Sequence, residues 1–93
     1  MKKILIIDDE PDAAEIMKML LSREGYSVDW TYDPLKGLDM MKDYDLLLLD
    51  IMMARMSGRA VLAEMKKRGI KLPVIVVSAV GLPLEVGEEL NRE

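Results

Sequence analysis

The sequence contains no cysteine, no histidine and no phenylalanine. The lack of cysteine excludes disulfides and thiol catalysis, and the lack of both cysteine and histidine excludes the usual zinc sites and histidine general bases. Aromatic residues make up only 4% of the chain, so the core must be aliphatic, with nine methionines as adaptable filler. Chemistry in this chain therefore depends on carboxylates, hydroxyls, amines or a bound hard cation.

The sequence also lacks an excess of positive charge and a long apolar run. Asp and Glu outnumber Lys and Arg by 17 to 13, which argues against nucleic acid as a direct partner. No apolar run approaches the roughly 18 residues of a membrane span, so we expect no membrane association. The amino-terminal apolar run is too short for a signal peptide, and a cytoplasmic location is expected. The length of 93 residues predicts a single domain over residues 1–93.

Four short aliphatic runs predict β-strands, three of them buried on both faces as in parallel sheets. These runs lie at residues 4–7, 27–31, 46–49 and 73–77, the second being the less apolar strand. Between them, helices are expected from Pro11 to the stop signal at Gly25, from Asp33-Pro34 to Met41, and from a Ser57 cap to Gly69. The alternation of strands and helices predicts an α/β fold with a parallel sheet and helices on its faces.

The helical spacing of apolar residues predicts which side chains face the sheet. The inward set comprises Ala13, Ile16, Met17, Leu20 and Leu21 in the first helix, Leu35, Leu38 and Met41 in the second, and Val61, Leu62 and Met65 in the third. The segment 79–93 has a weaker pattern, in which Pro83 can open a partial helix that Gly87 interrupts. We expect the fold to be clear up to residue 78 and incomplete beyond it.

Polar side chains follow three of the four predicted strands: Asp8 and Asp9, Asp50, and Ser78. In open α/β sheets, ligands bind outside the carboxyl ends of the strands, and if the first and third strands are neighbours, Asp8, Asp9 and Asp50 crowd together there. Crowded carboxylates repel one another unless a cation joins them, and Mg²⁺ prefers such oxygen ligands. One carboxylate could then act as a nucleophile toward a phosphoryl group whose charge the cation offsets.

Taken singly, each of these residues has a structural alternative. Asp8 and Asp9 also suit the acidic start of a helix, Asp50 could cap the loop after its strand, and Ser78 is a common loop residue. What favours a site is that all of them follow strands at the same predicted sheet edge.

Three segments resemble the receiver domains of bacterial two-component response regulators. Residues 3–10 (KILIIDDE) resemble the opening of that family, and residues 50–58 (DIMMARMSG) resemble the segment that starts at its phosphorylated Asp. Residues 73–79 (PVIVVSA) resemble its fourth strand with a hydroxyl residue at the end. The resemblance implies a flavodoxin-like, three-layer fold with strand order 2-1-3-4, in which the fifth strand and fifth helix are missing.

The resemblance also implies roles for individual residues. Asp50 matches the phosphoacceptor, Asp8 and Asp9 match the acidic pair that holds Mg²⁺, and Met52 matches the position whose main-chain carbonyl ligates the metal. Ser78 matches the switch hydroxyl that moves to the phosphoryl group. The implied phosphodonor is a histidine kinase or a phosphotransfer protein. The implied product is an acylphosphate in a signalling module that is not a classical enzyme.

The sequence departs from the family pattern at two places. Ala54 stands where family members usually have proline. No Lys or Arg lies between Lys71 and Arg92, so the family's Lys that pairs with the phosphoryl group is expected to be missing. Without a fifth strand, residues 74–77 would form an apolar edge, which predicts a homo-oligomer formed through that edge or through a swapped segment.

Two other functions stay open at this point. The chain could be a non-signalling dimerisation or assembly module, or a fragment of a longer receiver, that retains only the acidic metal site. A metal-dependent phosphatase would also use an Asp at a strand end. Such enzymes usually have a second Asp two residues later, where this chain has Met52.

Overall fold

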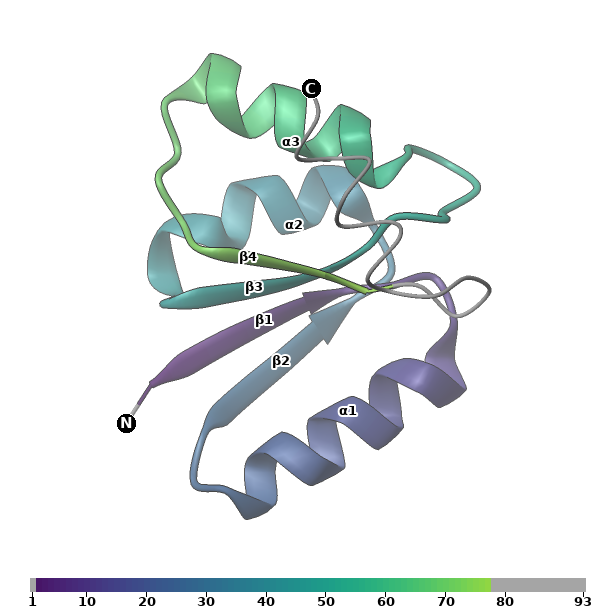
Figure 1. Cartoon of the computed structure of the whole chain (residues 1–93), viewed down its shortest axis with the longest axis vertical. Coiled ribbons are helices and arrows are strands. Elements are labelled where there is room, and N and C mark those ends of the chain that lie inside the picture. Colours follow the sequence, from purple (N-terminus) through teal and green to yellow (C-terminus); the bar gives the residue numbers. More distant parts are fainter. Residues whose placement is uncertain (1, 78–93) are drawn as a thin grey trace.

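A four-stranded parallel sheet forms the centre of the molecule (Figure 1). The computed structural model describes residues 2–77. The strands are β1 (Lys3–Ile7), β2 (Ser27–Thr31), β3 (Leu46–Asp50) and β4 (Val74–Val77). Their order in the sheet is β2-β1-β3-β4, which confirms the predicted order. Ser78 and the expected partial helix at residues 83–90 lie outside the described residues.

Helices cover both faces of this sheet and complete three layers. They are α1 (Pro11–Arg23), α2 (Pro34–Met40) and α3 (Gly58–Arg68), with a short 3₁₀ turn, η1 (Met41–Asp43), after α2. In Figure 1, α1 lies on one face, and α2 and α3 lie together on the other. None of the helices between residues 2 and 77 combines the length and apolar character needed to cross a bilayer.

Local hydrogen bonds explain where α2 and α3 begin and where α3 ends. The Asp33 carboxylate accepts hydrogen bonds from the N–H groups of Leu35 and Lys36, and the Ser57 hydroxyl accepts one from the N–H of Ala60. Both side chains satisfy donors that the first helical turn leaves unpaired. α3 ends at Gly69, whose φ of 72° lies in the left-handed region that glycine adopts without strain. The predicted helix start at Asp33-Pro34, the predicted Ser57 cap and the predicted stop at Gly69 are confirmed.

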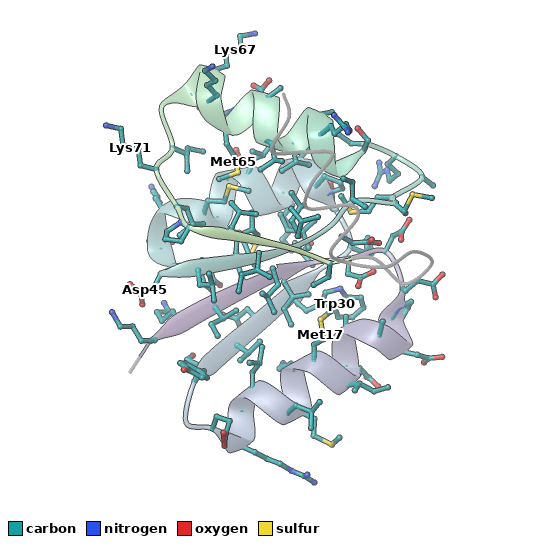
Figure 2. All side chains as sticks on the ribbon, viewed as in Figure 1. Met17, Trp30, Asp45, Met65, Lys67 and Lys71 are labelled. Atoms are coloured by element: carbon teal, nitrogen blue, oxygen red, sulfur yellow. The ribbon has the colours of Figure 1, made fainter. Side chains whose placement is uncertain are left out.

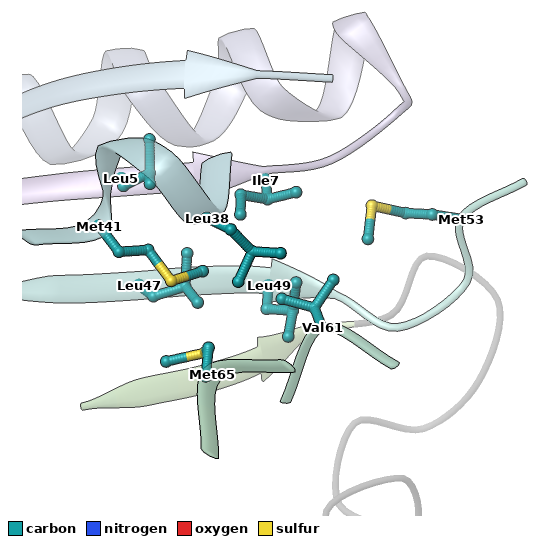
Figure 3. Packing of buried hydrophobic residues seen from close by; sticks show 9 residues of the cluster. All are labelled: Leu5, Ile7, Leu38, Met41, Leu47, Leu49, Met53, Val61 and Met65. Carbon is teal, nitrogen blue, oxygen red and sulfur yellow. The ribbon is translucent and has the colours of Figure 1, made fainter. Parts of the chain in front are cut away.

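Two aliphatic clusters, one on each face of the sheet, form the core. Side chains of β1 alternate between them, so Leu5 and Ile7 face α2 and α3, whereas Ile4 and Ile6 face α1. Figure 3 shows the first cluster, in which Met41, Met53 and Met65 fill the space around the leucines. The core is aliphatic and methionine-rich, as the composition predicts.

The prediction for the inward face of α1 was partly wrong. Ala14 is the buried residue of this helix, and Met17 and Leu21 pack against the core beside it. Ile16 and Leu20 were expected to face the sheet, but they are 54% and 51% exposed. α1 carries two apolar stripes at helical spacing, and the sheet accepts the one that includes the small Ala14. Leu35 of α2 was likewise expected inside and is exposed.

β4 is less buried than its apolar sequence predicts. Ile75 is 51% exposed, and the other three residues of the strand are half-buried. Within residues 2–77, β4 pairs with β3 alone and stands at the edge of the sheet. The expectation of a strand buried on both faces was therefore wrong for β4.

Candidate metal centre

Three carboxylates meet at the carboxyl ends of β1 and β3. These strands are neighbours in parallel register, with Ile7 opposite Leu49, so the residues that follow them emerge at the same edge. One carboxylate oxygen from each of Asp8, Asp9 and Asp50 lies within 4.8 Å of the others. We call these three residues the acidic cluster. Asp8 and Asp50 are buried, and Asp9 is half-buried.

Hydrogen bonds from both sides fix the position of Asp8. Its carboxylate accepts a hydrogen bond of 2.9 Å from the N–H of Glu10, and its main-chain carbonyl accepts one of 2.8 Å from the Trp30 indole. Its own N–H donates to the carbonyl of Thr31. Trp30 packs with Met17 between the sheet and α1, where Figure 2 labels both side chains. The loop after β1 is therefore anchored to β2.

The environment of Asp50 makes its ionised form costly. Burial, followed by the negative charges of Asp8 and Asp9, raises the pKa of Asp50 to about 6. The N–H of Met52 opposes this effect by donating a hydrogen bond of 3.1 Å to the carboxylate. A buried carboxylate with a raised pKa beside other acidic groups is typical of a functional site.

The main chain of α3 approaches the backbone beside Asp50 very closely. A Cβ atom added to Gly58 would lie 2.7 Å from Cα of Ile51 and 3.1 Å from the Asp50 carbonyl oxygen. The N–H of Gly58 donates a hydrogen bond to the Ile51 carbonyl at this contact. The absence of a side chain at position 58 therefore lets α3 support the segment that follows the cluster.

Asp9 receives its hydrogen bond from a distant part of the sequence. The N–H of Ala54, in the loop between β3 and α3, donates to the Asp9 carboxylate over 3.0 Å. The bond joins the two loops that carry the acidic cluster. Neither this donor nor the Trp30 indole was predicted, because no local sequence signal marks a main-chain N–H or a side chain that reaches across the sheet.

The donors of the acidic cluster suit a hard divalent cation. They are all carboxylate oxygens, which Mg²⁺ prefers over nitrogen or sulfur ligands. The predicted convergence of Asp8, Asp9 and Asp50 is confirmed, although convergence does not assign their roles. The Met52 side chain is exposed, and its carbonyl as a ligand stays a prediction. Ser78, the predicted switch residue, lies outside the described residues.

Sequence comparisons connect this arrangement to signalling proteins. A model of the response regulator receiver domain matches residues 4–90. The transcriptional regulatory protein DltR of Streptococcus agalactiae is 39% identical over 79 residues, which are 83% of this chain and 35% of that protein. The response regulator MprA of Mycobacterium tuberculosis is 37% identical over 79 residues, 83% of this chain and 34% of that protein. The chain spans about a third of the length of these relatives.

Structural comparisons agree with the sequence comparisons. The receiver domain of a Francisella response regulator matches with a TM-score of 0.82 at 27% identity, covering 98% of this chain and 77% of that one. The response regulator TrrA of Thermotoga maritima, solved in complex with Mg²⁺ and BeF, matches with a TM-score of 0.78 at 29% identity. That match covers 99% of this chain and 98% of the other. The flavodoxin-like receiver fold is thereby established.

Proposed function

The chain belongs to the response regulator receiver domain family, and on that premise we propose that Asp50 accepts a phosphoryl group. The observation that carries the proposal is the meeting of Asp50 with Asp8 and Asp9 at the end of β3. Receiver domains are signalling modules rather than classical enzymes, so the expected output is a change in binding. The donor, by family, is a phosphohistidine of a kinase or phosphotransfer protein.

Phosphoryl transfer requires that the Asp50 carboxylate act as the nucleophile, that it be ionised, and that it be correctly oriented. A carboxylate oxygen of Asp50 attacks phosphorus while the bond from phosphorus to the histidine nitrogen breaks, and the nitrogen keeps the electron pair. Asp50 must be ionised to attack, and with a pKa of about 6 it is mostly ionised at pH 7. The N–H of Met52 holds one carboxylate oxygen, which orients the group.

We assign the metal ligands as Asp8, Asp9, Asp50 and the main-chain carbonyl of Met52. Bound there, Mg²⁺ would supply positive charge that offsets the phosphoryl oxygens and the crowded carboxylates. The fit rests on the hard oxygen donors and their spacing in the acidic cluster. The role of Ser78 as the switch hydroxyl is proposed on sequence resemblance alone.

Mass spectrometry tests the acceptor directly. Incubation with acetyl phosphate and Mg²⁺ should add one phosphoryl group to the wild-type chain and none to Asp50→Asn, because the amide is not a nucleophile for this reaction. Asp43→Asn, which changes an exposed carboxylate away from the acidic cluster, serves as the matched control and should be phosphorylated normally. Equal mass gain in the wild type and in Asp50→Asn would exclude Asp50 as the acceptor.

The exposed edge of the sheet supports a second, separate proposal, that the chain self-associates through β4. An edge strand offers unpaired main-chain groups to another chain, and Ile75 adds an apolar side chain that is 51% exposed. We expect sedimentation coefficients to rise with protein concentration and Ile75→Lys to weaken this dependence. Lys42→Ala, an exposed change elsewhere, is the control. A single monomeric species at every concentration would contradict self-association.

A further inference from the structure

We propose that Arg55 sets the balance of charge at the acidic cluster, where it favours the approach of an anionic phosphodonor and weakens the binding of a free cation. The inference rests on the proposed function, because it concerns which charged species reach the same site. Arg55 lies in the loop between β3 and α3, directly after Ala54, whose nitrogen is 3.0 Å from a carboxylate oxygen of Asp9. The residue is thus one position away from a direct contact with the cluster.

The surroundings of Arg55 are otherwise acidic. The described loops at the carboxyl edge of the sheet are residues 8–10, 32–33 and 51–57, and Arg55 is the one basic residue in them. The carboxylates at this edge come from Asp8, Asp9, Glu10, Asp33 and Asp50. An anionic phosphodonor is repelled by these carboxylates, and a guanidinium, which stays ionised at any working pH, offsets part of that repulsion.

Asp33 holds Arg55 only loosely. Nη1 of Arg55 lies 3.9 Å from Oδ2 of Asp33, and the two side chains are 66% and 31% exposed. Exposed ion pairs contribute little, so the guanidinium can leave Asp33 for another anion. The other carboxylate oxygen of Asp33, Oδ1, accepts the hydrogen bonds that cap α2. The charge of Asp33 can therefore be removed without removing the cap.

A role through charge predicts opposite effects on an anion and on a cation. Arg55→Glu reverses the charge, so we expect phosphorylation by acetyl phosphate at saturating Mg²⁺ to slow about 5-fold and the dissociation constant for Mg²⁺ to fall about 3-fold. Asp33→Asn keeps the Oδ1 acceptor and removes a negative charge, so both of its effects should have the reverse sign. Intact-mass kinetics measure the phosphorylation rate, and isothermal titration with MgCl₂ measures the affinity.

Two further variants separate charge from other causes. Lys67→Glu is the matched control, because it changes the net charge equally at an exposed position in the last turn of α3, at the end of that helix away from this loop (Figure 2). Both of its properties should stay near those of the wild type. Arg55→Lys keeps the charge and should also resemble the wild type. Raising the salt concentration from about 0.02 M to about 0.5 M should largely remove the effects of Arg55→Glu, because salt screens charges.

The outcomes distinguish failure of the inference from failure of the proposed function. A phosphorylated wild type whose rate and Mg²⁺ affinity are unchanged by Arg55→Glu overturns the inference and leaves the proposed function standing. A loss of both rate and affinity in Arg55→Glu also overturns the inference, because damage to the loop, and not charge, explains that result. A wild type that takes up no phosphoryl group overturns the proposed function and the inference with it.

Discussion

Replacing Asp50 by Asn should stabilise the metal-free protein at pH 7 by at most about 3 kcal/mol. The pKa of Asp50 is about 6 in the folded chain against 3.8 for a free side chain, and this difference sets the upper limit. Asn has the same shape, can still accept the hydrogen bond from the N–H of Met52, and can donate to the carboxylate of Asp8. The variant therefore keeps the contacts and removes the buried charge.

The sign of the pH dependence follows from the raised pKa. Between about pH 4 and pH 6 the folded wild type binds more protons at Asp50 than the unfolded chain does. The protonated form of Asp50 therefore raises the free energy of unfolding, and this stabilising contribution is fully present below about pH 4. It is lost as the pH rises through about 6. Asp50→Asn lacks this contribution, so its advantage over the wild type should be small at pH 4 and largest above pH 6.

Urea unfolding in the presence of a chelator measures this effect. The free energy of unfolding of wild type, Asp50→Asn and the exposed control Asp43→Asn should be compared from pH 4 to pH 7. Saturating Mg²⁺ should stabilise the wild type more than Asp50→Asn, because a cation favours ionised carboxylates. If the free energy of unfolding changed with pH in the same way in the wild type and in Asp50→Asn, burial and the neighbouring charges would not destabilise the ionised form of Asp50.

Leu5→Ala should cost about 3 kcal/mol of stability, a large share of the 5–15 kcal/mol typical of a folded domain. Leu5 is fully buried in the central strand β1, between β2 and β3, and packs in the cluster with Leu38 and Met41 (Figure 3). Truncation to alanine removes apolar contacts on which two strands and α2 depend. The change lies in the middle of the strand, so the Mg²⁺ affinity of the folded fraction should stay close to that of the wild type.

Leu35→Ala is the matched control for the core prediction. Leu35 is 57% exposed, so the same truncation should change the free energy of unfolding by less than about 0.5 kcal/mol. Both variants can be compared by urea unfolding at a single pH. Similar midpoints for Leu5→Ala and Leu35→Ala would contradict the assignment of Leu5 to the core.

The sequence predicted those parts of the fold that depend on local chemistry. Asp33-Pro34 was identified as a helix start and Ser57 as a helix cap, because such signals act on N–H groups only two or three residues away. Parallel strands flanked by helices also fixed the edge at which Asp8, Asp9 and Asp50 meet. That the first and third strands are neighbours, which brings the three carboxylates together, came from the strand order that the family resemblance implies.

Features that depend on tertiary contacts were not predictable in the same way. α1 has two apolar stripes, and only packing decides that Ala14 faces the sheet while Ile16 faces outward. The apolar run at residues 74–77 alone predicted a strand buried on both faces, whereas the expectation of an edge strand came from the family resemblance, and Ile75 is 51% exposed. The bond between Ala54 and Asp9 joins two loops through a main-chain donor that every residue except proline carries.

The central place of β1 also bears on how the chain folds during synthesis. β1, α1 and β2 are contiguous and can form a βαβ unit while the rest of the chain is still being made. β3, which brings Asp50, is added later on the other side of β1. Asp50 joins Asp8 and Asp9 only when β3 pairs with β1, so the repulsion among these carboxylates opposes the docking of β3 rather than the formation of the β1-α1-β2 unit.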